Sequence, residues 1–183
     1  VQAGDEIYLR WDNCYGDGGA YNRVFACDTN SGAETLVGSF RLDSATDKIT
    51  GAVIVMDLAS VGPQFPSWWG MGGANCRTSS SLQGIFARPS TSTVCADPWL
   101  GRAIGGASFL SLGGNSARIQ ISLSMAQGEV LTAQAGQEVF AFQLRINHAR
   151  TTGLGACNGC SEPFCIPWSW GGIMRSQDAV PTR

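Results

Sequence analysis

The chain has 183 residues, of which 44% are hydrophobic and only 14% are charged, whereas about 25% charged residues is usual for soluble proteins. This length suits one domain with a complete core, over residues 1–183, and is too short for two. The net charge of −2, without any basic cluster, argues against nucleic acid or an anionic membrane surface as a partner. No apolar run approaches the ~20 residues that a membrane span needs.

Alternation of apolar and polar residues predicts strands rather than helices along the whole chain. In chain order, the predicted strands cover residues 7–11, 35–42, 52–58, 82–87, 109–112, 117–125 and 138–147, followed by an apolar segment over 164–170. The segment 52–58 is apolar on both faces and is therefore predicted to be central. Gly, Asp, Asn and Pro concentrate in residues 12–19 and 63–73, which predicts loops there, while 101–106 is expected to be flexible and 129–137 to be a polar connection.

This pattern predicts an all-β fold of about eight or nine strands. We expect a single disulfide-stabilised β-sandwich or jelly-roll-like domain, with a polar C-terminal tail over residues 175–183. The missing signal peptide suggests a mature protein from which a leader has been removed.

Seven widely spaced cysteines predict an oxidising compartment and a secreted or cell-surface protein. They are Cys14, Cys27, Cys76, Cys95, Cys157, Cys160 and Cys165. We expect Cys14 to pair with Cys27, and Cys76 with Cys95. The three remaining cysteines lie in one loop and leave one odd thiol, which is either free or bonded to another chain.

The spacing Cys157-x-x-Cys160 also resembles half of a zinc site, which Cys165 and His148 could complete. The competing interpretation is one disulfide and one odd thiol in this loop. It is favoured because no second Cys-x-x-Cys occurs in the chain. Covalent haem attachment is excluded, since Ser161 stands where a histidine is needed.

His148 is the only histidine, so any mechanism of the Ser-His-Asp or Cys-His type must use it. The chain has no Gly-x-Ser-x-Gly elbow, and a lone histidine after a core strand is more often a hydrogen-bonded structural residue. The spacing of the carboxylates recommends no pair for glycoside hydrolysis. We therefore predict that the protein is not an enzyme, and a secreted hydrolase is only the third hypothesis.

One region concentrates oxygen ligands that calcium could use. The alternation of Asp28, Asn30 and Glu34 around Gly32 resembles a calcium loop, although ordinary Asx-turns require the same residue types. Calcium is therefore the one candidate cofactor. The candidate ligands are Asp12, Asp17, Asp28, Asn30 and Glu34.

Six tryptophans could supply a platform for stacking sugars. Trp68 and Trp69 stand side by side in a loop, and Trp168 and Trp170 are expected on one face of a terminal strand. Packing in the core or within a loop explains them equally well. The second functional hypothesis is a carbohydrate-binding module that uses Trp68 and Trp69, with a polysaccharide as the partner.

The stretches WDNC, ACDTNSG and INHARTTGLGACNGCSEPFCI resemble secreted proteins of environmental bacteria. The shared pattern of cysteines and turns covers most of the chain. The resemblance implies export and a disulfide-bonded β domain. That group has no assigned activity, so no catalytic residue is carried over; the missing Asn-x-Ser/Thr sequon also favours a bacterial origin.

The leading hypothesis is an extracellular structural or interaction protein that assembles with copies of itself into a filament, sheath or surface layer. Low charge, an odd thiol and strand-forming ends support it. In this hypothesis the sheet edge of one copy accepts residues 1–11 or 164–173 of a neighbour as an added strand.

Overall fold

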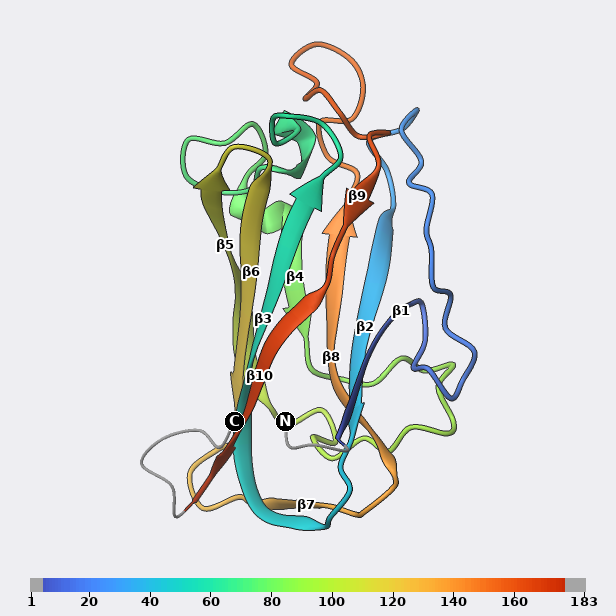
Figure 1. The fold of residues 1–183 in the computed structure, drawn as a ribbon, viewed down its shortest axis with the longest axis vertical. Coiled ribbons are helices and arrows are strands. Elements are labelled where there is room, and N and C mark those ends of the chain that lie inside the picture. The colour runs from blue at the N-terminus through green and yellow to red at the C-terminus, as the bar shows by residue number, and fades with distance from the viewer. Residues whose placement is uncertain (1–4, 177–183) are drawn as a thin grey trace.

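The computed structural model describes residues 5–176 and confirms an all-β chain (Figure 1). In this part of the chain the helices are two single 3-10 turns, Ser67–Trp69 and Ser79–Ser81. None of the described helices has the length and apolarity needed to cross a bilayer. The start of the predicted donor segment 1–11 and most of the predicted tail 175–183 lie outside the described residues.

Four strands form an antiparallel sheet, sheet A, in the order β1-β2-β8-β4. Their bounds are β1 Glu6–Trp11, β2 Ala33–Arg41, β8 Glu138–Asn147 and β4 Leu82–Ile85. The strand β8 is central and most of its residues are buried on both faces. It follows that β1 and β4 are the edges of sheet A.

Sheet B contains six strands around the long strand β3. Its main path is β10-β3-β6-β5, and the short strands β7 and β9 pair with the two ends of β3. The bounds are β3 Thr46–Ser60, β5 Ile104–Gly113, β6 Ser116–Ser124, β7 Leu131–Ala133, β9 Phe164–Cys165 and β10 Trp168–Arg175. The predicted central position of residues 52–58 is confirmed, and β10 and β5 are the edges of the main path.

The two sheets enclose one common core. On β6 the residues Ile119, Ile121 and Leu123 are buried, while Gln120 and Ser122 between them are exposed, as the alternation predicts. The core continues in sheet A through Phe140, Phe142 and Leu144, among other side chains. Figure 1 shows sheet B on the left and sheet A on the right of this core.

The structure has ten strands in the described residues, more than the eight or nine predicted. Residues 104–106 were expected to be flexible because of their glycines, yet they begin β5 and pair with Ser122–Ser124 of β6. Ladder hydrogen bonds to an existing strand compensate for the low strand preference of glycine. The short strand β7 likewise forms inside the expected connection 129–137, where Leu131 and Ala133 pair with β3.

A register shift in β10 separates two tryptophans that were expected on one face. Trp168 is paired with the buried Met56, whereas Trp170 is paired with the half-buried Val55 on the other face of β3. The extra residue between them is a β-bulge, and a bulge redirects the side chains that follow it. The prediction of a shared face for the two tryptophans is therefore wrong.

Candidate functional site

The disulfides connect segments that are far apart in the chain. Both predicted pairs, Cys14 with Cys27 and Cys76 with Cys95, are wrong. The hairpin and the neighbouring strand were expected to close local loops, but long-range pairing of the strands brings distant loops together instead. The three bridges are Cys14–Cys95, Cys27–Cys160 and Cys76–Cys157, with sequence separations of 81, 133 and 81 residues.

The cysteines of the last loop have separate partners. Because Cys157 and Cys160 are bonded to distant cysteines, neither is a thiolate that could bind zinc, and the expected disulfide inside this loop is also wrong. Cys165 is the odd thiol and is free and exposed. Three disulfides in a chain of this size indicate an oxidising environment.

Asp17 fastens the loop after β1 to the segment before Trp99. Its carboxylate accepts hydrogen bonds from the backbone N–H groups of Thr93, Val94 and Cys95 at 2.7, 2.9 and 3.3 Å. Burial alone would raise the pKa of Asp17, but these N–H groups outweigh it and lower the pKa to about 2. Both sulfurs near Asp17, in Cys14 and Cys95, belong to the bridge, so this group provides no thiolate for a metal.

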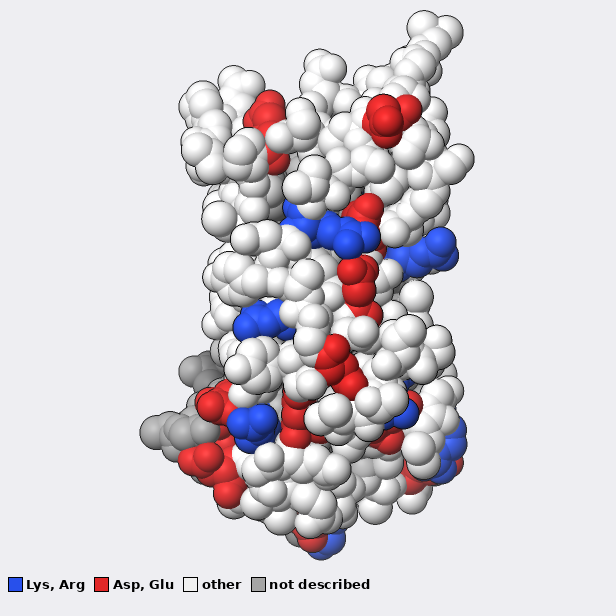
Figure 2. Space-filling view, turned by 90° about the vertical axis from the view of Figure 1, so that its right-hand side faces the viewer, with Lys and Arg blue, Asp and Glu red and all other residues white. Residues whose placement is uncertain are grey.

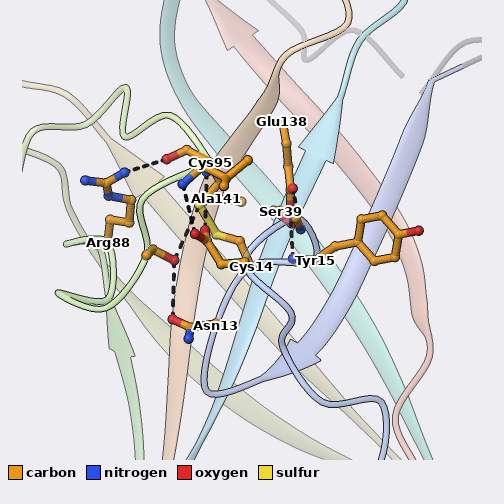
Figure 3. The surroundings of a disulfide bond; sticks show 12 residues. Asn13, Cys14, Tyr15, Ser39, Arg88, Cys95, Glu138 and Ala141 are labelled. Carbon is orange, nitrogen blue, oxygen red and sulfur yellow. Dashed lines mark hydrogen bonds between the residues drawn. A yellow bond between two sulfur atoms is a disulfide. The ribbon is translucent and has the colours of Figure 1, made fainter.

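Glu138 is a second point of attachment for this loop, beside the Cys14–Cys95 bridge (Figure 3). This buried carboxylate accepts hydrogen bonds from the N–H groups of Tyr15 and Gly16 at 2.9 and 2.8 Å, and from the hydroxyl of Ser39 at 2.5 Å. Three donors satisfy a buried charge that would otherwise be costly. The role of Glu138 in this structure is therefore to hold the loop on sheet A.

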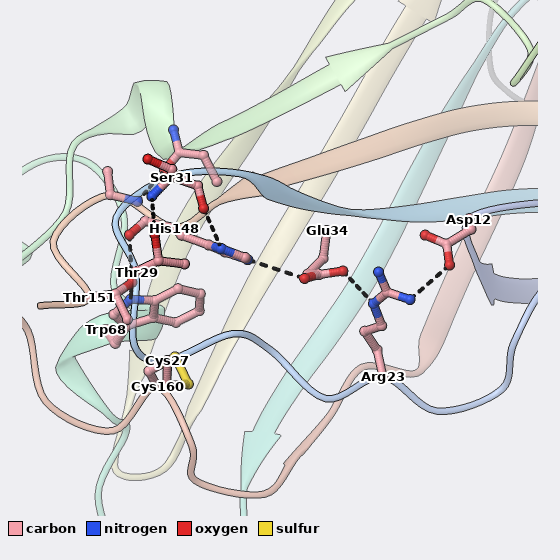
Figure 4. A network of polar contacts seen from close by, with 12 residues as sticks. Asp12, Arg23, Cys27, Thr29, Ser31, Glu34, Trp68, His148, Thr151 and Cys160 are labelled. Atoms are coloured by element: carbon pink, nitrogen blue, oxygen red, sulfur yellow. Dashed lines mark hydrogen bonds and ion pairs between the residues drawn. A yellow bond between two sulfur atoms is a disulfide. The ribbon is translucent and has the colours of Figure 1, made fainter.

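His148 belongs to a row of alternating charged and polar groups (Figure 4). Asp12 pairs with Arg23 at 2.9 Å, Arg23 also contacts Glu34, and Oε1 of Glu34 lies 3.2 Å from Nε2 of His148. The other ring nitrogen, Nδ1, lies 2.9 Å from the carbonyl oxygen of Ser31. Both ring nitrogens of the buried histidine therefore face oxygen atoms of the protein, and neither faces a nucleophile.

The backbone of His148 is fixed as well. Its carbonyl oxygen accepts a hydrogen bond from the hydroxyl of Thr151, and that hydroxyl accepts one from the indole N–H of Trp68 at 2.8 Å. These contacts match the hydrogen-bonded structural role expected for a lone histidine.

The five candidate calcium ligands do not surround one point. Asp12 and Glu34 lie together, but the cation that they share is the guanidinium of Arg23. The side-chain oxygen of Asn30 accepts hydrogen bonds from the N–H groups of Thr151 and Thr152. Asp17 is bound to the backbone of residues 93–95. Asp28 is exposed and follows Cys27 of the Cys27–Cys160 bridge. Calcium binding by this set stays a prediction.

Trp68 and Trp69 are buried rather than exposed. The guanidinium of Arg77 lies 3.9 Å from the centre of the Trp68 ring and donates hydrogen bonds to the carbonyl oxygens of Trp68 and Asn147. Burial lowers the pKa of Arg77 to about 10. Trp69 stacks on Phe164 at 4.4 Å. Sugar stacking needs an open ring face, so the expectation that these two tryptophans are exposed is wrong.

The edges of the two sheets differ in how they are protected. In sheet A, β1 carries Glu6 and Arg10 and its end is bridged from Trp11 to Ala20, while β4 has only four residues. Charge and shortness are the usual means by which proteins prevent pairing between sheet edges. Sheet A is therefore protected on both sides.

Sheet B lacks this protection. The ten residues of β5 and the eight of β10 include a single charged side chain, Arg175, which is paired with Asp47 at 3.0 Å. On β5 the side chains of Ile104, Leu110 and Leu112 are 67%, 59% and 48% exposed. Within the described residues, β5 pairs with β6 alone and β10 with β3 alone. Both edges of sheet B thus have a long backbone with almost no charge, although the start of β5 lies against Gly84 of β4.

Two cavities lie along the side where β1 and β10 run. The first, of about 250 Å³, is lined by Ile7, Ile54 and Trp168, among others. The second, of about 600 Å³, is lined by Trp11, Phe164 and the free Cys165, among others. The sheets are therefore separated by hollows on this side, and the odd thiol borders one of them.

Sequence reasoning predicted only residues 109–112 of β5, because the glycines of 101–106 were interpreted as a flexible link. The signal that could have revealed the whole strand is the run of ten residues without a charge that precedes the clear strand β6. Comparison with protein-family models, with curated proteins and with solved structures found no match for this chain.

Proposed function

We propose that this protein is a secreted, non-enzymatic structural subunit that assembles with copies of itself by pairing the β5 edge of one copy with the β10 edge of the next. The observation that carries the proposal is the almost complete absence of charge on both edges of sheet B. Three disulfides support an extracellular setting. We further classify the two-sheet domain as a β-sandwich of jelly-roll type.

The side chains of the two edges match when the strands are placed next to each other. Leu110 and Leu112 are exposed on β5, while Trp170 and Met174 are half-buried on β10. Pairing would bury these apolar side chains and use backbone groups that are open in the single subunit. The proposed contact needs no cofactor.

The two edges are different strands, so the contact is heterologous. Such a contact repeats without closing unless its rotation happens to form a ring. The expected product is an open polymer in which sheet B continues from copy to copy, as a filament, sheath or layer would require. The exposed Cys165 could then link neighbouring copies covalently.

The structure changes which segments are proposed to pair. The described part of the segment 1–11 and the segment 164–173 are strands of the subunit's own sheets, as β1, β9 and β10. Neither is needed as a donated strand. We therefore retain β10 as a pairing edge and replace β1 by β5.

A charge on the β5 edge tests the proposal. We expect negative-stain electron microscopy and sedimentation velocity to show polymers of the wild type and monomers of Leu110→Lys, with the same melting temperature for both. The matched control is Gln120→Lys, which places lysine on the exposed position of the inner strand β6 and should leave assembly intact.

The same variant tests the direction of assembly. Leu110→Lys keeps its β10 edge, so a small fraction added to the wild type should cap growing ends and shorten the polymers. Wild-type protein that stays monomeric at all concentrations, or Leu110→Lys that forms normal polymers, would contradict the proposal.

A further inference from the structure

The three tyrosines of the chain gather on one surface of β1 and its following loop, together with two arginines. Tyr8 and Tyr15 stack in parallel, with ring centres 4.4 Å apart and an angle of 4° between the rings. The guanidinium of Arg10 lies 5.0 Å from the ring centre of Tyr15 and 5.1 Å from that of Tyr21. Arg41 lies 5.8 Å from the ring centre of Tyr8. We call this row, Arg41–Tyr8–Tyr15–Arg10–Tyr21, the tyrosine ladder.

The two arginines of the tyrosine ladder differ in their charge partners. Arg41 pairs with Glu6 at 2.8 Å, and the hydroxyl of Tyr8 donates to the same carboxylate. Arg10 donates one hydrogen bond, to the carbonyl oxygen of Leu9 at 2.9 Å, and across residues 5–176 it has no carboxylate partner. Most N–H donors of the Arg10 guanidinium are therefore available to an anion from outside the subunit.

The open end of the ladder is exposed. Tyr15 is 45% exposed and Tyr21 is 77% exposed, and Tyr21 also borders the cavity of about 600 Å³. The loop is already held by the Cys14–Cys95 bridge and by the backbone hydrogen bonds between Trp11 and Ala20. The exposed ring of Tyr21, next to Arg10 without a carboxylate partner, is not needed to hold the loop. Its position suits the binding of a ligand.

The charges around the tyrosine ladder restrict which chemical class of ligand can bind there. Figure 2 faces the side on which β1 and its loop lie in Figure 1, and it shows basic and acidic side chains interspersed on an otherwise uncharged surface. A nucleic-acid strand would need several free cations along its phosphates. One free guanidinium between ring faces instead fits a ligand that presents single carboxylates beside apolar ring faces.

We infer that the tyrosine ladder binds a polysaccharide made of carboxylated sugars. The carboxylate would accept paired hydrogen bonds from Arg10, for which the planar guanidinium is suited. The apolar face of the sugar ring would pack on the face of the Tyr21 ring. The neighbouring cavity gives space for the chain to continue. This site is distinct from the sheet B edges and does not depend on assembly.

Isothermal titration with polygalacturonate tests the inference, with the neutral polymer amylose as the comparison ligand. We expect the wild type to bind polygalacturonate, with an affinity that falls as salt is added, and to bind amylose at least about tenfold more weakly. Arg10→Gln and Tyr21→Ala should each weaken binding by at least about tenfold. Tyr21→Phe keeps the ring and should remain within about twofold of the wild type.

The outcomes separate the alternatives. No binding of polygalacturonate by the wild type, unchanged binding by both Arg10→Gln and Tyr21→Ala, or equal binding of amylose would each overturn the inference. A change in sedimentation of the sugar-free protein in Arg10→Gln would instead assign the ladder to contacts between copies, and would overturn it too. Leu110 lies in sheet B, whereas the tyrosine ladder lies on β1 of sheet A. The Leu110→Lys variant should therefore bind polygalacturonate as the wild type does, even if it does not assemble.

Discussion

Cys27 is bonded to Cys160 across 133 residues of sequence. The bridge joins the loop that follows β1 to the loop that precedes β9. Five residues after Cys160, the free Cys165 is exposed. One short segment thus carries a cysteine that constrains the fold and a cysteine that does not.

Removal of this bridge should be costly. We expect the double variant Cys27→Ser, Cys160→Ser to lose about 3–5 kcal/mol of unfolding free energy, because the unfolded chain regains the freedom of a long loop. Urea denaturation measures the loss. The control Cys165→Ser should stay within about 0.5 kcal/mol of the wild type, and an equal loss in both proteins would contradict the assignment of Cys165 as the free thiol.

Glu34 should contribute far more to stability than a surface carboxylate. Its replacement in Glu34→Ala leaves Nε2 of the buried His148 without its carboxylate and removes one of the two carboxylate partners of the exposed Arg23. We expect a loss of about 3 kcal/mol. The exposed pair of Asp47 and Arg175 supplies the matched control, since Asp47→Ala should cost less than about 1 kcal/mol. Urea denaturation of both variants measures the difference. Equal losses would contradict the larger contribution that we assign to Glu34.

Acid should weaken the attachment of the loop that Asp17 holds. The pKa of Asp17 is about 2 in the folded protein, below its ordinary value of 3.8, so folding favours the ionised form. Its stabilisation is therefore complete above about pH 4 and is lost as the pH falls through about 2.

The variant Asp17→Asn isolates this contribution. We expect the difference in unfolding free energy between wild type and variant to be largest near pH 6 and to shrink as the pH approaches 2, because the wild-type carboxyl then becomes neutral like the amide. Chemical denaturation across this pH range provides the measurement. A difference that is independent of pH would mean that the N–H groups of Thr93 and Val94 do not distinguish the two charge states.

Much of the fold could be predicted, because strands leave a local signal. The alternation in residues 117–125 and the apolar run in 52–58 are properties of neighbouring residues, and both became strands in the expected places. The odd thiol could also be predicted, since seven cysteines cannot all pair within one chain.

The candidate sites could be predicted much less well. The sequence leaves Trp68 and Trp69 open to two interpretations, a sugar-stacking platform or packing in the core or a loop. Contacts with Phe164 and Arg77 bury them. The tyrosine ladder joins β1 to a loop whose path no local pattern specifies.

The sequence alone determined the all-β class, the oxidising environment, most strands and the existence of one unpaired cysteine. Only the tertiary structure decided which cysteines pair, which strands become sheet edges and which aromatic rings stay exposed. The physical reason is that periodicity records which face of a strand is buried, whereas pairing, edges and exposure depend on segments that meet only after long loops have closed. Cys27 and Cys160 meet in that way, and so do Tyr8 and Arg41 at the ladder.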